Sequence, residues 1–72
     1  MPELLDCRGL KCPQPVLKVA IRAHGAEPGT TLEVQADCES FTSDIQKWCS
    51  DNGRVLVGVV DRGSYAVATV QL

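Results

Sequence analysis

Hydrophobic and polar positions follow one another with periods that predict helices and strands in turn. Residues 4–7 form a short apolar stretch, which favours a strand. A helical pattern begins after it, with apolar residues three and four positions apart in two adjoining stripes: Val16, Ala20 and Ala23, then Leu17 and Ile21. Residues 31–36 alternate strictly between apolar and polar, so they predict a strand with one face toward water.

The second half of the chain predicts one more helix and two more strands. Phe41, Ile45, Trp48 and Cys49 fall at positions i, i+4, i+7 and i+8, which is typical of an amphipathic helix. Residues 55–60 are rich in valine and predict a strand. Residues 61–64 predict a hairpin turn, and residues 65–72 predict the last strand.

The predicted order is therefore strand, helix, strand, helix, strand, strand. The first two strands are joined by a helix and should be parallel, whereas the last two form an antiparallel hairpin. Two helices are too few to cover both faces of four strands. We expect a single domain over residues 1–72, an α/β two-layer sandwich with a four-stranded mixed sheet and both helices on one face.

Charge and hydropathy exclude several classes of partner and location. The formal net charge is -2, whereas binding to phosphate backbones needs a basic surface, so no direct nucleic-acid partner is expected. The chain starts without the pattern of a secretory signal, and no apolar run reaches the roughly 20 residues of a membrane span. These features predict a cytoplasmic protein without membrane insertion, whose four cysteines should be reduced.

Cys12 has the most favourable setting for thiol chemistry. If Cys12 is the N-cap of the first helix, Pro13 and Pro15 occupy first-turn positions whose N–H groups have no helical partner, so the prolines cost little. Because Pro15 has no N–H, the Gln14 N–H becomes the main donor facing the sulfur.

The turn before Cys12 adds to this setting. Gly9 tolerates a positive φ, and Arg8 and Lys11 bring positive charge to the helix end, where the helix dipole is also positive. All these effects favour an anionic sulfur, the reactive form of cysteine. The same residues also suit an incidental cysteine at a helix start, so both alternatives stay open.

The segment LDCRGLKCPQPVL, residues 5–17, closely resembles the signature of the TusA family (also called SirA-like) of sulfur carriers. The signature is a Cys-Pro-x-Pro motif after an Asp-x-x-Gly-Leu stretch, and the likeness extends over essentially the whole chain. It implies a two-layer α/β sandwich without a cofactor. It also implies that Cys12 accepts sulfur as a persulfide from a cysteine desulfurase or another donor. An acceptor protein would then take the sulfur into tRNA thiolation, molybdenum cofactor formation or other sulfur metabolism.

The chain departs from this family where members commonly have Asp-Asp-Pro, since residues 37–39 are Asp-Cys-Glu. Cys38 follows the second parallel strand and should leave the sheet at the same end as Cys12. One hypothesis is that Cys38 acts as a resolving thiol or as a second residue that carries the sulfur. The alternative is that Cys38 is simply an exposed loop residue. Cys7 and Cys49 lie in apolar patterns and are predicted to be core residues.

The cysteine spacing predicts no metal site, because structural zinc sites pair ligands two to four residues apart and this chain has no such pair. The leading prediction is a sulfur-relay protein rather than a stand-alone enzyme, with an exposed Cys12 and no substrate pocket, acting at protein–protein interfaces. Two alternatives are a thiol redox or regulatory switch using Cys12 and Cys38, and an interaction module without thiol chemistry.

Overall fold

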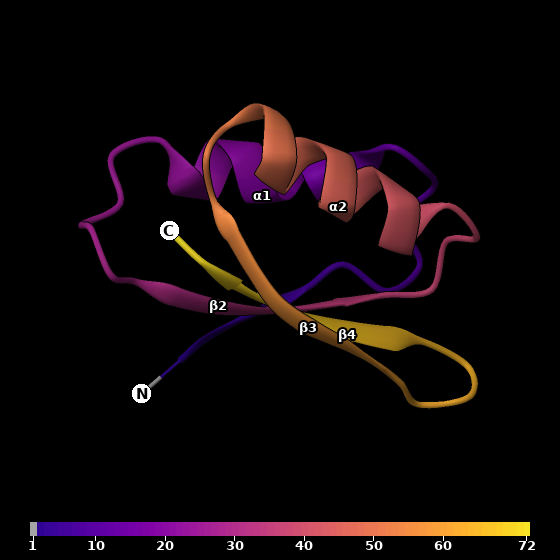
Figure 1. Ribbon diagram of the computed structural model, residues 1–72. Coiled ribbons are helices and arrows are strands. Elements are labelled where there is room, and N and C mark those ends of the chain that lie inside the picture. Colours follow the sequence, from indigo (N-terminus) through magenta and orange to yellow (C-terminus); the bar gives the residue numbers. More distant parts are fainter. Residues whose placement is uncertain (1) are drawn as a thin grey trace.

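The computed structural model describes residues 2–72 and confirms the predicted order of elements (Figure 1). The sheet has the strand order β1-β2-β4-β3, in which β1 and β2 are parallel and the other neighbours are antiparallel. Both helices lie on one face of this sheet, as expected for a two-layer sandwich. The elements are β1 (Glu3–Asp6), α1 (Gln14–Ala23), β2 (Thr31–Ala36), α2 (Phe41–Asp51), β3 (Val55–Asp61) and β4 (Ala66–Gln71).

The core lies between the sheet and the two helices. Strand β2 contributes Leu32, Val34 and Ala36, all buried, which confirms the alternation predicted from the sequence. Helix α2 places Phe41, Ile45 and Cys49 against the sheet, and this confirms the predicted apolar stripe. The core of so small a domain is thin, and each of these side chains carries a sizeable share of its stability.

Helix α1 is buried along a different line from the one that its pattern predicts. Its buried residues are Pro15, Val19 and Ala23, each four positions after the previous one. Leu17 and Ile21, which form the second of the two adjoining apolar stripes, are 55% and 73% exposed. The domain has only two layers, and a helix in the outer layer buries only the side that faces the sheet and its neighbouring helix.

Both helices are short, with 10 residues in α1 and 11 in α2. Helix α1 ends just before Gly25, whose φ of +83° reverses the chain in the way common at helix ends. Within residues 2–72, no helix combines the length and the apolar character that crossing a bilayer requires.

The topology brings two loops to one edge of the sheet. Strands β1 and β2 run in the same direction, so the loops that follow them, residues 7–13 and 37–40, leave the sheet on the same side. In the first of these loops Gly9 has a φ of +85°, which confirms the predicted turn. This edge therefore carries both cysteines that the sequence associates with chemistry.

Candidate functional site

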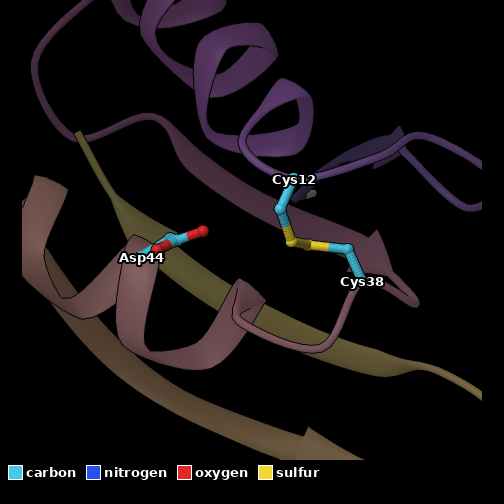
Figure 2. A group of neighbouring side chains, drawn as sticks. All are labelled: Cys12, Cys38 and Asp44. Atoms are coloured by element: carbon cyan, nitrogen blue, oxygen red, sulfur yellow. A yellow bond between two sulfur atoms is a disulfide. The ribbon is translucent and has the colours of Figure 1, made fainter.

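Cys12 and Cys38 meet at this edge and are joined by a disulfide (Figure 2). They are 26 positions apart in the sequence, but their Cα atoms lie 5.7 Å apart. That separation falls in the usual range of about 4.4–6.8 Å for bridged cysteines. Both residues are half-buried, whereas the sequence predicted an exposed Cys12. The loops thus shield each sulfur in part and present both at one place.

The expectation that all four cysteines are reduced is wrong for this pair. The disulfide can form because the parallel pairing of β1 with β2 brings the two loops close enough for Cys12 and Cys38 to bond. Cys7 and Cys49 are free thiols in the core, as predicted. Burial raises the pKa of both Cys7 and Cys49, which keeps these thiols protonated and unreactive.

Main-chain groups hold the two loops together. The Gly9 N–H donates to both carboxylate oxygens of Asp37, at 3.1 Å each. The Cys7 N–H donates to the Gln35 carbonyl at 2.7 Å and extends the β1–β2 pairing into the loop. Asp37 directly precedes Cys38, so this tether fixes one cysteine relative to the turn that leads to the other.

The helix start differs from the predicted arrangement at the hydrogen-bond level. Helix α1 begins at Gln14, and its N-cap is Pro13, so Cys12 lies one residue before the cap. The Gln14 N–H donates to the Lys11 carbonyl at 2.8 Å, and the predicted bond from this N–H to the sulfur is wrong. The Gln14 N–H is therefore used in a tight turn that directly precedes the helix. Pro15 is the second helical residue and is buried, so it acts by packing.

The basic residues near Cys12 have separate roles. Arg8 forms a bidentate pair with Asp6, with both nitrogen–oxygen distances 3.0 Å, and its guanidinium lies 5.1 Å from the Tyr65 ring centroid. The Arg8 hydrogen bonds lower the pKa of Asp6. The charge of Arg8 is thus paired within the turn. Lys11 is exposed, and none of the ion pairs formed within residues 2–72 involves it.

Asp44 is a member of the site that the sequence analysis missed. It lies in the first turn of α2, where the Ser40 hydroxyl donates to it at 2.8 Å. The two sulfurs and a carboxylate oxygen of Asp44 all lie within 4.8 Å of one another, and the carboxylate points toward the sulfurs (Figure 2). A negative charge this close disfavours a second negative charge on either sulfur.

The same three residues have the donor types of a thiophilic metal site once the disulfide is reduced. Two thiolates and one carboxylate would supply three ligands for an ion such as Zn²⁺. Ligand spacing along the sequence does not exclude a metal at this group, because its members come from two different loops and a helix. The sequence does show Asp44 as an acidic residue in the first turn of the helix that follows Cys38. Its distance from the sulfurs, however, depends on how α2 packs on the sheet.

A hollow of about 480 Å³ lies beside the cysteines, lined by residues 9–12 and 37–40. Similar hollows of about 470 and 420 Å³ lie elsewhere on the surface, and all three are open to solvent, so the absence of an enclosed substrate pocket stays a prediction. The hollow beside the cysteines has Cys12 and Cys38 in its lining. It gives Cys12 room for additional atoms on its sulfur.

A two-layer sandwich with a cysteine pair at the carboxyl edge of parallel strands defines a small thiol protein. The family model described as "Sulfurtransferase TusA" matches residues 3–72, and the chain belongs to this family. Similar relatives come from Bacillus subtilis (strain 168). One, named "Putative sulfur carrier protein YrkF", is 32% identical over 60 residues, which is 83% of this chain and 32% of YrkF.

A second relative from the same organism is named "Putative sulfur carrier protein YrkI". It is 31% identical over 61 residues, which cover 85% of this chain and 81% of YrkI. The chain therefore spans about a third of YrkF but most of YrkI. Family membership confirms the resemblance of residues 5–17.

Proposed function

We propose that this protein is a sulfur carrier that holds sulfur as a persulfide on Cys12. The observation that carries the proposal is the position of Cys12, the cysteine of the Cys-Pro-x-Pro motif, on the rim of the hollow at the sheet edge. Cys7 and Cys49 are poor candidates because both are buried and their pKa values are raised. Membership in the TusA family supports the same chemistry.

Loading requires a partner that brings activated sulfur. In the proposed step the Cys12 thiolate attacks the outer sulfur of a persulfide on a cysteine desulfurase or similar donor. A sulfur–sulfur bond forms on Cys12, and the donor cysteine leaves as its thiolate, so no cofactor is needed. The disulfide with Cys38 must be reduced beforehand, because only a free thiolate attacks.

Delivery follows the same chemistry toward an acceptor protein. A thiolate of the acceptor attacks the outer sulfur, and Cys12 departs as the thiolate. The acceptor would serve tRNA thiolation, molybdenum cofactor formation or other sulfur metabolism in the cytoplasm, without direct contact between this chain and nucleic acid. We assign supporting roles to the residues that shape the turn and the helix start presenting Cys12, namely Arg8, Gly9, Lys11, Pro13, Gln14 and Pro15.

The test is a mass measurement on the reduced chain after incubation with a cysteine desulfurase and cysteine. We expect a gain of one sulfur atom, located on the peptide that contains Cys12 and removed by reductant. The Cys12→Ser variant should gain no sulfur, and the Cys49→Ala variant should load like the natural chain. An adduct that survives in Cys12→Ser would overturn the assignment.

The disulfide itself favours a second candidate function, a thiol redox or regulatory switch using Cys12 and Cys38. On oxidation, the reduced chain would then lose two hydrogen atoms and gain no sulfur. Titration against mixtures of reduced and oxidised glutathione measures the reduction potential of the pair. If the loading experiment gives only this oxidised form, while the desulfurase is active toward another carrier, the switch is the better description.

A further inference from the structure

We propose that Cys38 is a resolving thiol that discharges the Cys12 persulfide and releases the carried sulfur as hydrogen sulfide. This inference rests on the proposed loading of Cys12. It adds a second outlet to the carrier, because sulfur can leave as a small molecule as well as pass to an acceptor protein. The residue that provides the outlet is the one at which the chain departs from the Asp-Asp-Pro that the family resemblance leads us to expect after the second strand.

The step is a thiol–disulfide exchange within one chain. The Cys38 sulfur attacks the inner sulfur of the persulfide, which is the Sγ atom of Cys12, and forms the Cys12–Cys38 disulfide. The bond between the inner and outer sulfur breaks, and the outer sulfur leaves with the electron pair as sulfide. Cys38 attacks as its thiolate, and the proton that it gives up goes to the departing sulfide, which leaves as HS⁻. The carried sulfur is thus reduced, and the two cysteines are the oxidised product.

No outside oxidant is required, but a reductant is needed to restore the carrier. Two equivalents of a cellular thiol, or one dithiol, reduce the disulfide and return Cys12 and Cys38 to free thiols. Each round therefore turns one carried sulfur into one sulfide. An acceptor protein competes with Cys38 for the loaded chain.

The geometry selects attack on the inner sulfur. The Cα atoms of Cys12 and Cys38 stand 5.7 Å apart, so the Cys38 sulfur reaches Sγ of Cys12 without backbone rearrangement. The bond from the Gly9 N–H to Asp37 keeps the loops at this separation. The hollow that Cys12 and Cys38 both line provides space for the outer sulfur beside the reacting pair.

Charge favours the same direction. A persulfide is anionic, and on Cys12 its inner sulfur lies within 4.8 Å of an oxygen of the Asp44 carboxylate. Discharge replaces the anionic persulfide with a neutral disulfide, and the sulfide ion carries the charge away from Asp44. Repulsion between like charges in the loaded state is thereby relieved.

The experiment loads the reduced chain with a cysteine desulfurase and cysteine, removes both, and follows free sulfide and intact mass. We expect sulfide to appear in step with the loss of bound sulfur, leaving a chain that has lost two hydrogens. The rate should not depend on protein concentration, because the reacting groups belong to one chain. In Cys38→Ser and Cys38→Asp, release should slow by at least about tenfold, since the intramolecular thiol is absent.

The Cys49→Ala variant is the matched control and should release sulfide like the natural chain. If no variant gains sulfur on Cys12, the proposed function itself fails. If the chain loads but Cys38→Ser releases sulfide as fast as the natural chain, only the role of Cys38 is overturned. Transfer of the sulfur onto the Cys38 peptide would also overturn it, because that result shows attack on the outer sulfur.

Discussion

The Gly9 N–H and the Asp37 carboxylate join the two loops that carry the site, with both donor–acceptor distances at 3.1 Å. This contact spans 28 positions in the sequence and connects the turn before Cys12 to the residue before Cys38. It is a hydrogen bond between a main-chain donor and a charged acceptor, a type stronger than its neutral counterpart. The position of the two sulfurs therefore depends on a residue with no thiol chemistry of its own.

Asp37→Ala should weaken the Cys12–Cys38 disulfide, because the loops lose the contact that holds them together. We expect a several-fold shift toward the dithiol in a glutathione redox titration and a loss of about 1 kcal/mol in the free energy of unfolding. Asp61→Ala is the matched control, since Asp61 accepts from the Gly63 N–H at 2.8 Å within the β3–β4 hairpin and does not join the two loops. An equal redox shift in both variants would contradict the prediction.

Reducing the disulfide should destabilise the fold. The bridge joins residues 26 positions apart, and closing such a loop lowers the entropy of the unfolded chain, which stabilises the fold by about 3.5 kcal/mol. Urea unfolding with and without a dithiol measures the difference. The Cys38→Ser variant should show no effect of the dithiol, and the interpretation fails if it responds as strongly as the natural chain.

The four cysteines should differ in their rate of alkylation in the native, reduced chain. Iodoacetamide should modify Cys12 and Cys38, which are half-buried on loops, long before Cys7 and Cys49. The core pair is shielded by packing, and burial also raises the pKa of each thiol. Peptide mass mapping after timed labelling gives the order, and all four should react in denaturant. Early labelling of Cys49 would contradict this arrangement.

Acid should weaken the fold through two carboxylates. Hydrogen bonds from Arg22 lower the pKa of Glu3, and those from Arg8 lower the pKa of Asp6. Their contribution is complete above the unfolded-state values, about 4.3 for Glu and 3.9 for Asp, and is lost as pH falls through the lower folded values. Unfolding free energies measured across that range should decline less steeply in a Glu3→Gln, Asp6→Asn double variant. An unchanged slope would show that other groups control the acid limb.

Substitutions at two apolar positions of α1, one buried and one exposed, should differ in their effect on stability. Val19→Ala should cost about 2 kcal/mol, because Val19 is fully buried and the change leaves a cavity. Ile21→Ala should change the free energy of unfolding by less than about 0.5 kcal/mol, since Ile21 is 73% exposed. Urea unfolding of the two variants provides the comparison, and similar losses would mean that Ile21 is covered in solution.

The sequence predicts the fold well because the strongest signals are local periods. Strict alternation in residues 31–36 identifies β2, and the spacing of Phe41, Ile45 and Cys49 identifies the buried side of α2. The buried side of α1 was harder to predict, because the helix carries more apolar residues than that side can hold. The pattern therefore includes Leu17 and Ile21 among the candidates for burial, although the sheet meets only the line through Val19.

At the site, topology was predictable and fine geometry was not. The rule that parallel strands end at one edge places Cys38 near Cys12, and the structure joins them. Whether the Gln14 N–H faces a sulfur depends on a tight turn that offers the Lys11 carbonyl instead. Asp44 reaches the sulfurs because of how α2 packs on the sheet, and periodicity along one helix carries no information on that distance.

The register of β1 on β2 has a consequence for how this site tolerates change. Leu5 pairs with Val34 and Asp6 with Gln35, so main-chain bonds set where each following loop begins. Sliding one strand by two residues would move its loop by about 7 Å, more than the span of a disulfide bridge. The separation of the sulfurs is thus a property of strand alignment. It depends on how β1 pairs with β2 and not on the length of the helix that connects them.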